Sequence, residues 1–161
     1  ENVLLSLQRA AGRSRRLFGN AGSQGDLTEQ AMAHLRDAGL QDRSAALAGA
    51  LSHGERRQLE VAVALATGPR LLLLDEPAAG MSPAETARLT EFLGRLPGEL
   101  TVMLIEHDLD VVFGVADTVT VLHLGRHLMT GAPAEVRASP EVQSAYLGGA
   151  DTSELFPGVA T

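Results

Sequence analysis

The chain has 161 residues, of which 45% are hydrophobic, and it carries a formal net charge of −7 at pH 7. This length and apolar content suffice for one globular domain with a core. The acidic balance argues against broad binding to nucleic acid or anionic lipid. The chain has no cysteine, which excludes disulfides and thiolate metal sites. No apolar run approaches the roughly 18 residues that a membrane-spanning helix needs.

The first third of the chain predicts two helices separated by a polar loop. Apolar residues at helical spacing indicate a helix over residues 1–10, and the Gly, Ser, Asn and Gln residues of 12–25 indicate a loop. Asp26 is expected to cap a second helix that ends near Gly39. Because no N-cap precedes the first helix, we expect the chain to enter a domain midway.

Two later helices have clear start signals. A serine followed three residues later by a glutamate, the capping-box spacing, predicts helices over residues 52–67 and 82–96. Gly68 and Pro69 end the first of them, and Pro83 stands at the first helical position of the second.

Two short apolar runs predict strands of a parallel sheet. Residues 71–74 are four leucines, which is typical of a strand covered on both faces, and residues 101–105 form the second run. Asp75 and Glu76 follow the first strand, and His107 follows the second. Because parallel sheets bind ligands beyond the carboxyl ends of their strands, both tips are candidate site positions. One carboxylate is suited to hold Mg²⁺ while its neighbour polarises an attacking water.

The last third predicts smaller elements. They are, in order, a brief helix, the two strands of a hairpin and two short helices: residues 109–115, 118–122, 127–129, 133–138 and 140–147. The tail over 150–161, rich in Gly, Thr, Ser and Pro, is expected to be flexible.

The order and spacing of these motifs resemble the nucleotide-binding subunit of ATP-binding cassette (ABC) transporters. Leu51-Ser52-His53-Gly54-Glu55 is similar to the signature motif of that family. Leu71 to Glu76 is similar to its Walker B strand and catalytic glutamate. Ala79-Gly80-Met81 resembles the D-loop, and His107 resembles the switch histidine. The resemblance runs from Glu1 to about Gly149 and is strongest to branched-chain amino acid importers, with urea importers a close second.

The resemblance implies an α/β fold, namely a partial P-loop NTPase core with parallel strands plus part of the helical subdomain. Residues 1–67 would form the helical (signature) subdomain, incomplete at its N-terminus. Residues 68–149 would form the C-terminal half of the ATPase core, and 150–161 a flexible tail.

The resemblance also implies a mechanism that uses ATP and Mg²⁺. Asp75 would hold the metal, Glu76 would orient the attacking water, and His107 would contact the γ-phosphate. The signature residues would serve ATP bound by a second ATP-binding subunit, in a homodimer or a heterodimer. The pair would dock on transmembrane permease subunits, from the cytoplasm, at the inner face of the cell membrane.

The chain departs from the family pattern in two ways within the signature motif. His53 stands where the family usually has glycine, so a positive φ there would strain the backbone. Glu55 replaces the common glutamine and would repel a nearby anion.

The larger departure is that the chain contains no lysine, since all 13 basic residues are arginine. The phosphate-cradling loop Gly-x-x-x-x-Gly-Lys-Ser/Thr requires one. We therefore expect a C-terminal part without the Walker A half, which alone binds ATP-Mg weakly and hydrolyses it negligibly. The missing strands should leave unpaired edges and exposed apolar surface, with oligomerisation or strand exchange as compensation.

Three functions follow as hypotheses. The first is the ATP-hydrolysing motor of an importer for branched-chain amino acids, or for urea or another small polar solute. The second is a naturally truncated, non-catalytic subunit that lends only its signature helix in trans. The third, a relative acting on DNA or ribosomes, is disfavoured by the acidic balance and by the lack of coiled-coil heptads.

Overall fold

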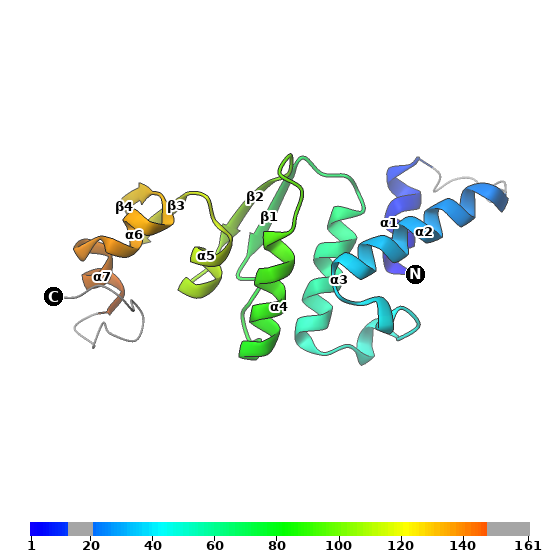
Figure 1. Ribbon diagram of the computed structural model, residues 1–161, viewed down its shortest axis with the longest axis horizontal. Coiled ribbons are helices and arrows are strands. Elements are labelled where there is room, and N and C mark those ends of the chain that lie inside the picture. Colours follow the sequence, from blue (N-terminus) through cyan, green and yellow to red (C-terminus); the bar gives the residue numbers. More distant parts are fainter. Residues whose placement is uncertain (13–20, 148–161) are drawn as a thin grey trace. The chain divides into compact units, whose positions relative to one another are not determined.

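The computed structural model of the chain describes residues 1–12 and 21–147. The chain divides into two compact units, Glu1–Val111 and Val112–Thr161. Figure 1 shows the elements in chain order. The predicted functional division at residues 67 and 68 stays a prediction, and the predicted flexible tail lies outside the described residues.

The first unit opens with three helices that contact one another: α1 (Asn2–Ala10), α2 (Ala21–Asp37) and α3 (His53–Leu65). Two single 3-10 turns connect α2 to α3: η1 (Gln41–Arg43) and η2 (Ala48–Ala50). The helices bury apolar side chains against each other, among them Val3, Leu7, Leu27, Ala31, Leu35, Val61 and Ala62. The predicted first helix and the predicted helix from Ser52 are confirmed.

The predicted loop over 12–25 is wrong at its end, because α2 begins at Ala21 and Asp26 lies inside the helix. Gly25 within a helix costs only about 1 kcal/mol relative to alanine. The predicted end of the helix is confirmed, since Gly39 follows it with a φ of 71°.

The second part of this unit is a strand–helix–strand arrangement. β1 (Leu71–Asp75) and β2 (Thr101–Ile105) pair in parallel, with Leu71 opposite Thr101 and Asp75 opposite Ile105. α4 (Pro83–Gly94) makes the crossover that parallel pairing requires. α5 (Leu109–Val115) follows β2, and the boundary between the two units falls within it, after Val111. The predicted strands and helices are confirmed here to within two residues.

Only one face of this sheet is covered, so the predicted burial of the leucine strand on both faces is wrong. Leu72 is 6% exposed, whereas Leu71 and Leu73 on either side are 52% and 64% exposed. Met103, opposite Leu73, and Ile105 are also more than half exposed. Among the described residues no element packs over these four side chains, which confirms the expected exposed apolar surface.

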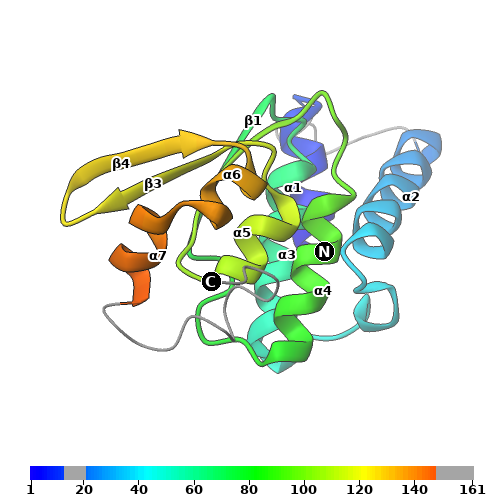
Figure 2. The ribbon, with the colours of Figure 1, turned by 60° about the vertical axis from the view of Figure 1, so that its left-hand side comes forward.

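The second unit is a hairpin backed by two helices, as predicted (Figure 2). Its elements are β3 (Val119–His123), β4 (Arg126–Gly131), α6 (Pro133–Ala138) and α7 (Pro140–Leu147). Their buried valines form one core: Val119, Val121, Val136 and Val142. Leu124 and Gly125 form the turn, both with positive φ (50° and 74°), as a two-residue hairpin turn of type I′ requires.

Candidate functional site

Parallel pairing brings the polar ends of β1 and β2 together. The N–H of Glu76 donates to the carbonyl of Ile105 at 2.8 Å, which aligns the two strand tips. Glu76 Oε1 lies 3.5 Å from His107 Nδ1, and their side chains are 54% and 70% exposed. Asp75, the last residue of β1, is also exposed. The three residues proposed from sequence for metal, water and γ-phosphate therefore share one accessible edge.

Glu76 has an unusual backbone. Its φ is 43°, and among the described residues only Leu124 shares a positive φ without being glycine. This left-handed conformation costs an L-amino acid roughly 1–2 kcal/mol. It turns the chain sharply after β1, and Ala79 N–H closes the turn on the Glu76 carbonyl at 3.1 Å. Strain of this kind persists only where surrounding contacts enforce it, and it gathers at functional sites.

Glu106 belongs to the polar stretch Glu106-His107-Asp108 after β2, but the sequence assigns it no role. Its side chain is only 1% exposed. One carboxylate oxygen accepts from Ala78 N–H at 2.8 Å and the other from His107 N–H at 3.0 Å. The sequence places Glu106 beside His107, but only the packed structure shows that this carboxylate is buried.

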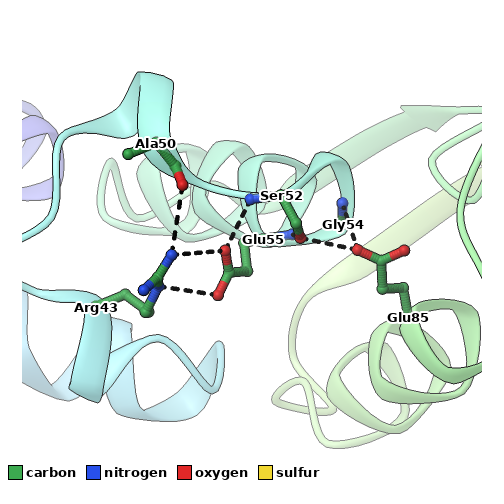
Figure 3. Close-up of polar contacts among 6 residues, drawn as sticks. All are labelled: Arg43, Ala50, Ser52, Gly54, Glu55 and Glu85. Atoms are coloured by element: carbon green, nitrogen blue, oxygen red, sulfur yellow. Dashed lines mark hydrogen bonds and ion pairs between the residues drawn. The ribbon is translucent and has the colours of Figure 1, made fainter.

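The signature segment begins α3 with the predicted capping box. Ser52 Oγ accepts from Glu55 N–H at 3.2 Å, and Ser52 N–H donates to Glu55 Oε2 at 2.8 Å. Leu51, just before the cap, is buried. Arg43 Nε lies 3.1 Å from Glu55 Oε1, so the charge of Glu55 is paired rather than aimed at a ligand. Figure 3 shows Arg43 and Glu85 approaching the helix start from opposite sides.

Glu85 of α4 binds two hydrogen-bond donors of the signature segment. Its Oε1 accepts from Ser52 Oγ at 2.8 Å and from Gly54 N–H at 3.2 Å (Figure 3). Hydrogen bonds lower the pKa of Glu85 to about 2, first from the Ser82 backbone N–H, then from the Ser52 hydroxyl. A Cβ on Gly54 would lie 2.8 Å from Glu85 Cγ, so glycine permits this approach. The helix start thus already holds a negatively charged oxygen, that of Glu85.

His53 joins the signature segment to the D-loop segment. It is the first residue of α3 and does not have a positive φ, so the strain considered for this position is absent. Its Nε2 lies 3.0 Å from the carbonyl of Ala79. Gly80 has a φ of 75°, and Met81 N–H donates to the Ala78 carbonyl at 3.1 Å. No hydrogen bond or ion pair among the described residues joins Ser52 directly to Asp75 or Glu76.

Few side chains at the tip of β1 could bind a metal ion. Within residues 1–12 and 21–147, no group of three or more His, Asp or Glu side chains is arranged to hold a metal. One exposed carboxylate, that of Asp75, is nevertheless what Mg²⁺ needs when phosphate oxygens and waters complete its octahedron. The residues present fit a metal that arrives with a nucleotide.

Comparison with known proteins identifies the family. Residues 3–79 match the family model described as ABC transporter, and residues 126–152 match that described as Branched-chain amino acid ATP-binding cassette transporter. The chain is 39% identical over 128 residues to the high-affinity branched-chain amino acid transport ATP-binding protein LivG of Salmonella typhimurium. The chain belongs to the ABC transporter family. The corresponding protein BraF of Pseudomonas aeruginosa is 40% identical over 128 residues.

These alignments cover 78% of the chain but 50% of LivG and of BraF, so the chain spans about half the length of these ABC relatives. Among solved structures, MJ1267, an ATP-binding cassette of an ABC transporter, has a TM-score of 0.70 at 25% identity, covering 91% of this chain and 62% of that one. The cbiO1 structure from Clostridium perfringens, part of the complex cbiONQ, has a TM-score of 0.69 at 26% identity, covering 87% and 54%. The predicted ABC ATPase fold is confirmed. No helix within the described part of the chain is long and apolar enough to cross a membrane.

Proposed function

We propose that this chain belongs to the ATP-hydrolysing motor subunit of an ABC importer. The observation that carries the proposal is the exposed pair of Glu76 and His107, 3.5 Å apart at the tips of two parallel strands of an ABC-family chain. An acidic and an imidazole group at one open edge are suited to act together on a phosphate and a water.

Each residue of this edge has a distinct role in the proposal. Asp75 binds Mg²⁺, which when bound neutralises charge on the phosphates. Glu76 orients the attacking water and draws on its proton, and His107 donates to the γ-phosphate. Because the side chains of Glu76 and His107 are exposed, a bound nucleotide can reach both of them.

The signature residues, Leu51 to Glu55, act in this proposal on ATP bound by a second ATP-binding subunit. The Ser52 hydroxyl and the Gly54 N–H are the donors, and the phosphate would have to displace the Glu85 carboxylate that they now bind. The positive end of the α3 dipole adds to them. The D-loop residues Ala79, Gly80 and Met81 lie next to them, through the contact of His53 with Ala79. The second subunit is either another copy or a sister ATPase.

The triphosphate itself requires a lysine-bearing loop, and these 161 residues contain no lysine. We therefore assign the phosphate loop to residues outside this chain, with 1–67 as part of the helical subdomain and 68–149 as part of the core. The exposed apolar face of β1 and β2 is where the rest of the core packs. Alone, this chain would bind ATP-Mg weakly and form oligomers or exchange strands. Micromolar ATP affinity in a calorimetric titration, or a monomer in solution scattering, would contradict these expectations.

We assign branched-chain amino acids as the transported solute. The assignment is supported by the match of residues 126–152 and by the similarity to LivG and BraF. The subunit would lie in the cytoplasm, bound to permease subunits at the inner face of the cell membrane.

The test is a reconstituted transporter containing the complete ATP-binding subunit, its permease and a binding protein. ATP hydrolysis should rise on addition of leucine but not urea, and Glu76→Gln should lower it by 100-fold or more, the order of magnitude for losing a general base. Stimulation by urea alone would favour the second importer class. A wild-type subunit that hydrolyses no ATP itself but supports hydrolysis by its partner would establish the non-catalytic alternative.

A further inference from the structure

We propose that Glu106 is a positioning residue that holds Glu76 and His107 in their working arrangement. Its catalytic meaning rests on the function proposed above. The carboxylate lies between the tip of β2 and the turn that follows β1, and its side chain is 1% exposed. A buried carboxylate is costly unless hydrogen bonds compensate for its lost hydration. The hydrogen-bond donors around the Glu106 carboxylate therefore identify the segments that it holds in place.

The two oxygens of Glu106 serve two different chain segments. Oε1 accepts from Ala78 N–H at 2.8 Å, in the turn after β1. Oε2 accepts from His107 N–H at 3.0 Å, with Asp108 N–H at 3.4 Å, in the segment after β2. These N–H groups stabilise the charge through charge-assisted hydrogen bonds. One side chain thus ties both site-bearing segments together.

The tie to Ala78 bears on Glu76. The turn begins at Glu76 and is closed by the Ala79 N–H, which donates to the Glu76 carbonyl. The φ of Glu76 is 43°, a left-handed conformation that is unfavourable for an L-amino acid. Ala78 and Pro77 are buried within it. Fixing the Ala78 N–H holds the turn closed and so keeps the Glu76 backbone left-handed, while the second tie fixes the His107 backbone.

This double tie requires a carboxylate. Glutamine has nearly the same volume but one acceptor oxygen, and its NH₂ group would face backbone N–H donors on one side. Glu106→Gln therefore leaves one segment without its partner. It changes no atom of Glu76 or His107, and it removes the carboxylate charge that lies 3.8 Å from His107 Nδ1.

In the complete ATP-binding subunit, Glu106→Gln should lower kcat for ATP by about ten- to a hundredfold, because misplacement by about 1 Å costs up to 100-fold. The KM for ATP should change less than about twofold, which locates the loss in turnover rather than in nucleotide binding. Glu99→Gln, at an exposed glutamate before β2, is the matched control. Turnover of the Glu106 variant within about twofold of this control would overturn the proposal.

A measurement on the complete ATP-binding subunit without nucleotide separates this proposal from the proposed function. By NMR, the wild-type Ala78 amide proton should be shifted downfield and protected from hydrogen exchange, and Glu106→Gln should remove protection at Ala78 or at His107. Wild-type Ala78 exchanging as fast as an open-loop amide would overturn the tie, even if the variant does not fold. A wild-type subunit without ATPase activity but with a protected Ala78 would refute the proposed function and leave the tie established.

Discussion

Replacing Glu76 with glycine should give a more stable protein than replacing it with alanine, although both changes remove a residue proposed for catalysis. The φ of 43° costs an L-residue roughly 1–2 kcal/mol, and glycine removes that cost. Glycine also loses more backbone entropy on folding than alanine does, which lowers the stability by about 0.5–1 kcal/mol. Compared with Glu76→Ala, which loses the same side-chain contacts but keeps the conformational cost, Glu76→Gly should be more stable by about 0.5–1 kcal/mol.

The assay is urea unfolding followed by far-ultraviolet circular dichroism, with the slope m checked for constancy between variants. Glu91 in α4 offers a control of opposite sign, because glycine in a helix interior should be about 1 kcal/mol less stable than alanine. Leu124, the other described non-glycine residue with a positive φ, should repeat the Glu76 result without any site role. If Glu76→Gly is no more stable than Glu76→Ala while both controls behave as stated, the strain argument is refuted.

Three further changes test the packing around the site. The pKa of Glu85, lowered from 4.5 to about 2, makes its hydrogen bonds a source of stability that is present above pH 4.5 and lost as the pH falls towards 2. Glu85→Gln should therefore make the urea midpoint of unfolding depend less on pH across that range. A midpoint that varies with pH as it does in the wild type would contradict this. Gly54→Ala should cost about 1–3 kcal/mol by urea unfolding through overlap with Glu85, and a Glu85→Ala background should recover most of it. Leu89→Ala, at a fully buried position of α4, should cost about 2–5 kcal/mol, and a loss below about 1 kcal/mol would count against the packing described.

The elements set by local chemistry were predictable from the sequence. Ser52 and Glu55 each accept from the other's backbone N–H at the start of α3, and Glu85 accepts from the Ser82 N–H at the start of α4. Both helices therefore begin where the sequence indicates. The turn at Leu124 and Gly125 likewise lies between two apolar runs and produces the predicted hairpin.

The features that failed depend on what packs against a residue. The four leucines of β1 read as buried on both faces, yet only tertiary contacts decide which side of a strand is covered. Asp26 reads as a helix cap, but α2 already begins at Ala21. The burial of Glu106, and the contacts of Glu85 and His53, join segments that the sequence does not show to be adjacent.

The half-covered sheet has a thermodynamic consequence. Leu71, Leu73, Met103 and Ile105 stay largely hydrated in the folded chain, so unfolding exposes less new apolar surface there than in a filled core. The heat-capacity increment of the chain on unfolding should therefore fall below the usual value of about 12–15 cal/mol/K per residue. The free energy of unfolding should then change less steeply with temperature. Any segment or second copy that packs on this face would restore the increment, and with a second copy the Tm would rise with protein concentration.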